Sequence, residues 1–287
     1  MDHHHPGAAA GGGLVETLPP VLALLVCAGL YLHLVGRARR RNPAQGWNGW
    51  RTASFGLGLL LLAVAFLPPL ASLAHTDFRG HMAQHLLVGM YAPLALVLGA
   101  PVTLLLRALP TAAARALTAV LRARAVRLVT HPAVASALST GSLVALYLTP
   151  LHPVATGHPA GHWLLHGHFL LSGYLFAYVI AGPDPAPARP GVRTRLVYLG
   201  LAIVGHATVS QLMYGGWAYV PAPVEQVRGG AELMYYGGDI AELLLAAALV
   251  TTWRPVRRPR VTRLVPTPAR VSAGAGRAGQ ETKTQNG

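Results

Sequence analysis

The sequence has few charged residues, a single cysteine and only one lysine. Charged side chains make up 11% of the 287 residues, whereas they make up about 25% of an ordinary soluble domain. Because Cys27 is the only cysteine, an internal disulfide and a cysteine-based metal site are excluded. A Gly-x-Ser-x-Gly motif, a Walker-type phosphate loop and a Rossmann fingerprint are also absent. We therefore do not expect an enzyme.

Apolar residues are abundant instead, and they are grouped in long runs. Hydrophobic residues make up 53% of the chain, which is more than the core of one soluble domain could bury. Runs of about 17 to 25 apolar residues are long enough to cross a bilayer as helices. Seven such runs lie near residues 18–36, 53–73, 81–107, 133–151, 162–181, a stretch ending near 213, and 232–253. The sequence therefore predicts an all-α polytopic membrane protein, a bundle of seven transmembrane helices in a lipid bilayer.

The formal charge of +14 comes from arginines that lie between alternate apolar runs and in the tail. Under the positive-inside rule, such segments face the cytoplasm. Alternation over seven runs then leaves only Arg79 and Arg228 outside, with the amino terminus outside and the carboxyl terminus in the cytoplasm. No basic stripe with interleaved aromatic residues occurs, so we expect no nucleic-acid partner.

The same pattern divides the chain into three segments. Residues 1–17 are rich in His, Gly and Ala and lack the basic start of a signal peptide, so we expect a flexible outer arm. Residues 18–253 form the predicted seven-helix transmembrane domain. Residues 254–287 lack apolar periodicity, which predicts a disordered, basic cytoplasmic tail.

Histidines gather at the predicted outer face. His81 and His85 open the third apolar run, and His162 and His166 open the fifth. Residues four apart share a helix face, so each pair presents two imidazoles together. One such pair suits a first-row transition metal but is more often a surface or core feature. Two pairs that enter from the same side favour a metal site.

Further side chains extend this candidate site. Met82 lies inside the first histidine pair, and His206 and Asp239 lie roughly 10 Å below the outer surface at 1.5 Å per residue. His206 and Asp239 could be ligands, or a structural hydrogen-bonded pair. Secondary candidates are His3, His75, His158, Met234 and Glu242. Imidazole, thioether and carboxylate ligands are compatible with copper, and less distinctively with zinc or iron.

Several motifs recur together along the chain. They are His81-x-x-Gln84-His85, Ala92-Pro93, Gly99-x-Pro101, His162-x-x-x-His166-x-x-Phe169 with Gly173, Pro183-Asp184-Pro185, and Glu225-Gln226-x-x-Gly229-Gly230 leading to Met234 and Asp239. Over residues 75–249 the chain resembles the CtaG-type cytochrome c oxidase assembly proteins of bacteria. The resemblance implies a multi-pass protein of the bacterial plasma membrane that serves the respiratory chain. It further implies a metallochaperone, which would deliver copper to the oxidase subunit that carries the copper centre.

Three alternatives stay open at this point. A copper permease would need polar groups that continue inward beyond Glu242. A haem-binding membrane redox protein could use the two histidine pairs as axial ligands. A metal-free assembly scaffold would keep its function after replacement of all four paired histidines.

Overall fold

The computed structural model describes residues 7–186 and 189–252, and these residues form helices joined by short loops. This confirms the predicted all-α class for the described part of the chain. The elements are α1 (Gly7–Arg41), α2 (Gly49–Phe66), α3 (Leu70–Thr76), α4 (Phe78–Leu86), η1 (Leu87–Tyr91), α5 (Ala92–Leu98), α6 (Pro101–Ala108), α7 (Thr111–Leu121), α8 (Arg124–Val129), α9 (Pro132–Ser136), η2 (Ala137–Gly141), α10 (Ser142–Tyr147), α11 (Leu151–Thr156), α12 (Pro159–Ala181), α13 (Val192–Tyr214) and α14 (Val224–Thr252). The elements η1 and η2 are π-helical turns.

Six helical stretches of the described residues are long and apolar enough to cross a membrane. They are Thr17–Arg41, Gly49–Phe66, Phe78–Ala108, Ala160–Ala181, Val192–Tyr214 and Val224–Thr252. The predicted run at 133–151 corresponds to the shorter apolar helix Pro132–Tyr147, because the chain leaves the helix before Pro150, where helical backbone is disfavoured. A seventh full-length span and the predicted orientation are therefore not confirmed.

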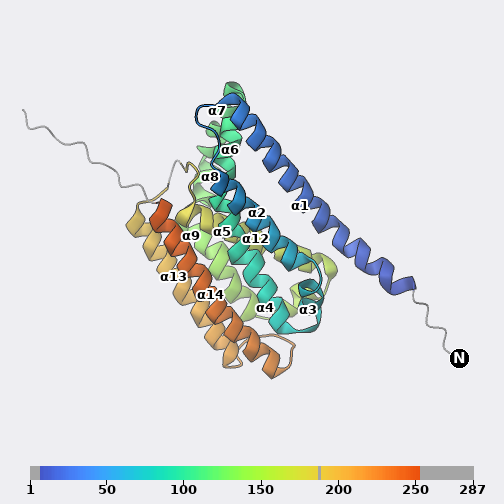
Figure 1. Ribbon diagram of the computed structural model, residues 1–287. Helices are drawn as coiled ribbons and strands as arrows, with labels where there is room; N and C mark the ends of the chain where they lie inside the picture. Colours follow the sequence, from blue (N-terminus) through green and yellow to red (C-terminus); the bar gives the residue numbers. More distant parts are fainter. Residues whose placement is uncertain (1–6, 187–188, 253–287) are drawn as a thin grey trace, which may run out of the picture. The chain divides into compact units, whose positions relative to one another are not determined.

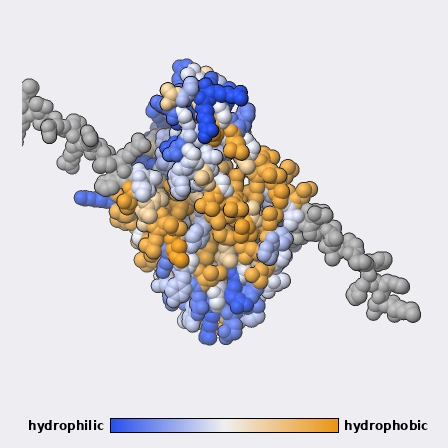
Figure 2. All heavy atoms as spheres, viewed as in Figure 1, coloured by the Kyte–Doolittle hydropathy of each residue, from blue (hydrophilic) through white to orange (hydrophobic). Residues whose placement is uncertain are grey.

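The surface of this helical unit carries a wide apolar band. On the face drawn in Figure 2, hydrophobic side chains cover the middle and hydrophilic side chains cover the two ends. Large apolar side chains are exposed on several helices, for example Leu171 (71%), Val204 (64%) and Leu243 (69%). Monomeric soluble proteins rarely expose contiguous apolar areas of this kind. The band is therefore the surface expected of a multi-pass membrane protein.

Two clusters of buried apolar residues lie along α12, α13 and α14. One contains Ile180, Leu199 and Leu249 and lies at the end of the bundle where arginines flank the helices, the arginine-rich end. The other contains Met82, Met213 and Met234 at the opposite end. The short stretch α9–η2–α10 connects the two clusters, because Ala135 belongs to the first and Tyr147 to the second.

The first helix is the outermost element of the bundle. Figure 1 shows α1 as a long helix that meets the rest of the bundle through its second half. Tyr31, Val35 and Ala38 pack there against Leu104 and Ala108 of α6. Helix α1 begins at Gly7, so residues 7–17 of the predicted arm are helical. Residues 1–6 and the predicted tail, 254–287, lie outside the described residues, and both proposals about them stay predictions.

A buried carboxylate joins the loop after α12 to the start of α6 at the arginine-rich end. Asp184, in the loop after α12, is 1% exposed. It accepts hydrogen bonds from the backbone N–H groups of Val102 (3.1 Å) and Thr103 (2.7 Å) and from the Thr103 hydroxyl. Ala100, the residue before the start of α6, has a left-handed backbone (φ 52°) and provides no side-chain cap for this helix. Asp184 therefore supplies the cap from a distant loop.

Candidate functional site

The first histidine pair lies on α4, whose start is fixed by an ordinary cap. The Asp77 carboxylate accepts a hydrogen bond from the backbone N–H of Arg79 at 2.8 Å and forms an ion pair with its guanidinium at 2.6 Å. These contacts with Arg79 lower the pKa of Asp77. His81 and His85 follow on the next turns of α4. The second pair, His162 and His166, lies in the first turns of α12.

The four paired histidines line one small cavity. His81 and His85 form one side of it, His162 and His166 form another, and Leu165 with other apolar side chains completes the wall. The cavity measures about 10 Å³, which is close to the least space that holds a single water molecule. The structure thus brings together two helix entries that are far apart in the sequence.

Two of these imidazoles already have hydrogen-bond partners. His81 Nε2 lies 3.2 Å from the Tyr147 hydroxyl, and His166 Nε2 lies 3.0 Å from Gln84 Oε1. The Gln84 amide nitrogen donates to the Ala65 carbonyl at 2.8 Å. The remaining Gln84 oxygen can only accept, so His166 Nε2 is the donor in its pair and Nδ1 keeps its lone pair. That tautomer leaves a nitrogen free to bind a cation.

The cluster is not a preformed metal site of histidine, cysteine and carboxylate side chains. Within residues 7–186 and 189–252, no group of three or more such side chains is arranged to hold a metal ion. His85 instead packs edge-on against Phe169, with ring centroids 4.4 Å apart. A bound metal would have to compete with the Tyr147 hydroxyl for His81 and draw the rings closer, whereas His166 can keep its hydrogen bond to Gln84 and bind through Nδ1.

A larger cavity adjoins the second histidine pair. It measures about 470 Å³, and both His162 and His166 belong to its wall together with His75 and His158. The rings of His75 and His162 are 5.8 Å apart. The predicted secondary residues His75 and His158 are therefore neighbours of the four-histidine cavity, through the two histidines that line both spaces.

His152 was not among the predicted site residues, although it lies at the same end of the bundle. Its ring centroid is 5.5 Å from that of His81 and 5.5 Å from that of Tyr147. Both of its ring nitrogens are buried without a hydrogen-bond partner. Burial lowers the pKa of His152 to about 4, so the ring is neutral at pH 7. The sequence predicted an uncharged loop here, with no second histidine four residues away, whereas the structure places His152 on the short helix α11.

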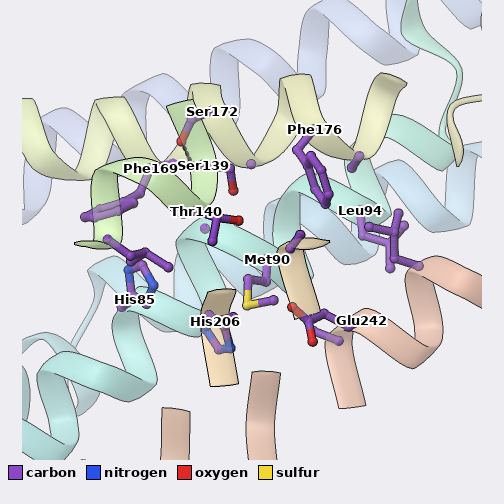
Figure 3. A pocket seen from close by; sticks show the side chains of 17 residues that line it. His85, Met90, Leu94, Ser139, Thr140, Phe169, Ser172, Phe176, His206 and Glu242 are labelled. Carbon is purple, nitrogen blue, oxygen red and sulfur yellow. Dashed lines mark hydrogen bonds between the residues drawn. The ribbon is translucent and has the colours of Figure 1, made fainter. Parts of the chain in front are cut away.

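A third cavity, the inner cavity, lies deeper in the bundle (Figure 3). It measures about 50 Å³, and its wall includes His85, Met90, His206 and Glu242. The Nδ1 atom of His85, both ring nitrogens of His206 and Oε2 of Glu242 are buried without a hydrogen-bond partner. His85 belongs to the walls of both this cavity and the four-histidine cavity, so its ring lies between them.

Three predicted ligands are placed differently from the prediction. Met82 and Met234 are fully buried in the apolar cluster that also contains Tyr147, away from the walls of the three cavities. Asp239 lies outside those walls too, and His206 forms no hydrogen bond with it. The structural His206–Asp239 pair is therefore wrong. The His206 ring packs over Gly238, and Glu242, one turn farther along α14, lines the inner cavity instead. His3 lies outside the described residues.

Several mycobacterial proteins are similar to this chain. The uncharacterized proteins Mb0105 of Mycobacterium bovis and MT0111 of Mycobacterium tuberculosis are each 29% identical to it over 254 residues, which is 80% of this chain and 38% of theirs. The uncharacterized protein ML1998 of Mycobacterium leprae is 31% identical over 182 residues, 61% of this chain and 28% of its own. The chain thus spans less than two fifths of the length of these relatives. No solved structure matches it.

A family match covers most of the helical unit. Residues 29–255 match the family described as cytochrome c oxidase caa3 assembly factor. The matched range includes all four histidines of the small cavity and every residue named in the inner cavity. It also confirms the resemblance drawn from the sequence motifs. This chain belongs to the family of cytochrome c oxidase caa3 assembly factors, Caa3_CtaG.

Proposed function

We propose that this protein assists the assembly of cytochrome c oxidase in the bacterial plasma membrane by binding copper at its histidine-rich end. The bound copper would be delivered to the oxidase subunit that carries the copper centre. Family membership supports the oxidase as the partner. The observation that carries the copper proposal is the single cavity lined by His81, His85, His162 and His166.

The chemistry of this cavity suits a metal that is held and then released. Neutral imidazoles are good ligands for copper in proteins, and among the divalent first-row metals Cu(II) has the highest affinity. In the metal-free protein, hydrogen bonds to Tyr147 and Gln84 hold His81 and His166. The bond to Tyr147 is worth about 0.5–1.5 kcal/mol net, so the ion displaces a weak partner of His81, and Tyr147 binds His81 again when the ion leaves. His166 can bind the ion through Nδ1 while Gln84 holds its Nε2.

The orientation of the site is part of the proposal. The stretch Pro132–Tyr147 runs from the arginine-rich end, where Ala135 is buried, to the histidine-rich end, where Tyr147 is buried. At 1.5 Å per residue it is about 24 Å long, a little less than the hydrocarbon core of a bilayer. We take it as a seventh, short crossing. The positive-inside rule then puts the histidine-rich end outside, where the cavity with His75 and His158 gives access to the four histidines.

Titration of the purified protein with Cu(I) under anaerobic conditions tests the copper proposal. A colorimetric Cu(I) chelator serves as the competitor. The wild-type protein should take copper from the chelator, and the variant with His81, His85, His162 and His166 all changed to alanine should bind at least one copper equivalent fewer. The control changes two histidines outside the cavities, His33→Ala and His131→Asn, and should bind as the wild type does. Equal copper binding by the quadruple variant would refute the assignment.

Oxidase assembly in cells separates the remaining alternatives. The variant genes are expressed in a strain that lacks the protein, and oxidase activity is measured at low and at high copper. A metal carrier predicts that the quadruple variant fails at low copper and is rescued in part by added copper. Full activity of that variant at low copper would favour a metal-free scaffold. A haem absorption spectrum in the purified protein would favour a redox protein, and copper uptake into vesicles a permease.

A further inference from the structure

The inner cavity combines buried polar atoms that have no partner within the protein. His206 is 3% exposed and Glu242 is 4% exposed, yet both ring nitrogens of the first and one carboxylate oxygen of the second form no hydrogen bond. A buried polar group left unsatisfied costs about 1–3 kcal/mol. Three such atoms that face one space indicate that something other than protein occupies it.

The backbone around the cavity is unusual as well. Met90 belongs to the π-helical turn η1, and Ser139 and Thr140 belong to the second such turn, η2. All three residues line this cavity. π-Helical turns are rare and occur frequently at functional sites, because the extra residue re-aims neighbouring side chains. Both π-helical turns among the described residues therefore supply the walls of one space inside the membrane-spanning unit.

We propose that the inner cavity is a second copper site, in which His206, Met90 and Glu242 hold a monovalent copper ion. Figure 3 shows the Met90 side chain directed between His206 and Glu242. The third donor is thus a thioether, which suits a soft cation such as Cu(I). This inference rests on the proposed function, because it assumes that the protein receives copper at the four-histidine cavity.

Charge favours a monovalent cation in this place. An isolated charge inside a membrane protein is costly and is found paired. Glu242 is the only carboxylate in the wall of the cavity, so one Cu(I) ion beside it gives a neutral pair. A divalent ion would leave an unbalanced positive charge in an apolar surrounding. The hydroxyl groups of Ser139 and Thr140 can accept hydrogen bonds from, or donate them to, any water that enters with the ion.

His85 connects the two sites. It lies in the walls of both cavities, and its Nδ1 atom has no hydrogen-bond partner. An imidazole between two metal sites can bind an ion on one side and release it on the other after a rotation of the ring. His85 is therefore the side chain at which the two cavities adjoin.

X-ray absorption of the copper-loaded protein tests the inner site, because a thioether ligand adds sulfur to the first coordination shell. The full chain is loaded with Cu(I) alone. The wild-type spectrum should contain a sulfur contribution, which Met90→Leu should remove together with one copper equivalent. The matched control is Met213→Leu, since Met213 lies in the apolar cluster at the histidine-rich end and outside the walls of the three cavities. It should leave the spectrum and the stoichiometry unchanged. The change from Met to Leu conserves side-chain volume, so both variants should fold.

The outcomes separate this inference from the proposed function. If Met90→Leu binds as much copper as the wild type, with an unchanged spectrum, the inner site is refuted and the four-histidine site stands. If the triple variant His81→Ala, His162→Ala, His166→Ala loses copper but keeps the sulfur contribution, the inner site exists independently. If the wild-type protein binds no Cu(I), the inner site and the proposed function both fail.

Discussion

Replacing Asp184 by alanine should destabilise the protein strongly, although this residue lies far from both histidine pairs. The carboxylate is buried and accepts three hydrogen bonds from the first turn of α6. No described side chain could take its place, because Ala100 at the start of α6 carries no polar group. The change would leave two part-buried backbone N–H groups, of Val102 and Thr103, without a protein acceptor.

The size of this effect follows from the number of orphaned donors. A fully buried donor left unsatisfied costs about 1–3 kcal/mol, so the two part-buried donors cost at most about 2–6 kcal/mol. For a chain of this size, about 4 kcal/mol corresponds to a fall in melting temperature of roughly 10 °C. Asp184→Asn should fall between the wild type and Asp184→Ala. The asparagine oxygen can still accept from Thr103, but its NH₂ group faces the N–H of Val102.

Thermal unfolding in detergent micelles measures the difference, with tryptophan fluorescence as the signal. The control is Glu225→Ala, because Glu225 is exposed and forms no ion pair with a described residue. The expected order of melting temperatures is wild type and Glu225→Ala together, then Asp184→Asn, then Asp184→Ala. A melting temperature of Asp184→Ala within a degree or so of the wild type would show that α6 does not need this cap.

Three further substitutions test the packing and the site. Gly173→Ala should prevent folding, because its Cβ would lie 1.9 Å from a backbone oxygen of η1. The control is Gly167→Ala on the same helix, whose Cβ would meet nothing within 4 Å, and the yields of folded protein from the two variants are compared. Gln84→Leu should lower the melting temperature, because it leaves the buried Ala65 carbonyl without its donor, at about 1–3 kcal/mol, and also removes the acceptor of His166. An unchanged melting temperature would contradict both bonds. Tyr147→Phe should tighten Cu(I) binding about 3- to 10-fold, because His81 loses a competing partner worth about 0.5–1.5 kcal/mol; weaker binding in the chelator competition would refute this.

The sequence was sufficient to predict the helical class, the membrane and the two histidine pairs. Apolar runs and the i, i+4 spacing are local properties, and both survive folding unchanged. The run at 133–151 was harder to judge because its hydropathy continues through Pro150, whereas the helix does not. Hydropathy alone counts apolar residues, but the length of a helix also depends on where proline removes a donor.

The inner cavity was only partly predictable, because it depends on rotation about the helix axes. His206 and Asp239 have the same depth, and depth was the only coordinate that the sequence offered. The side of α14 that faces His206 depends on Gly238, because the absence of a side chain there lets the His206 ring lie against the helix. Glu242 rather than Asp239 then turns toward the cavity. The contribution of Met90 depended on the π-helical turn η1, which shifts the register of every side chain after it.

The two cavities differ in a way that bears on the direction of copper movement. In the four-histidine cavity, the Tyr147 hydroxyl can satisfy His81 when an ion leaves, and Gln84 can hold His166 throughout. In the inner cavity, His206 and Glu242 have no such partners. When an ion leaves, their buried polar atoms stay without a hydrogen bond, which costs free energy. On the proposed function, the inner site should therefore hold copper more tightly than the outer one. Stepwise loading should fill it first, and sulfur should dominate the absorption spectrum at low copper before nitrogen does. The reverse order would mean that water already satisfies the inner groups, and that the deeper cavity is a hydrated space rather than a store for the ion.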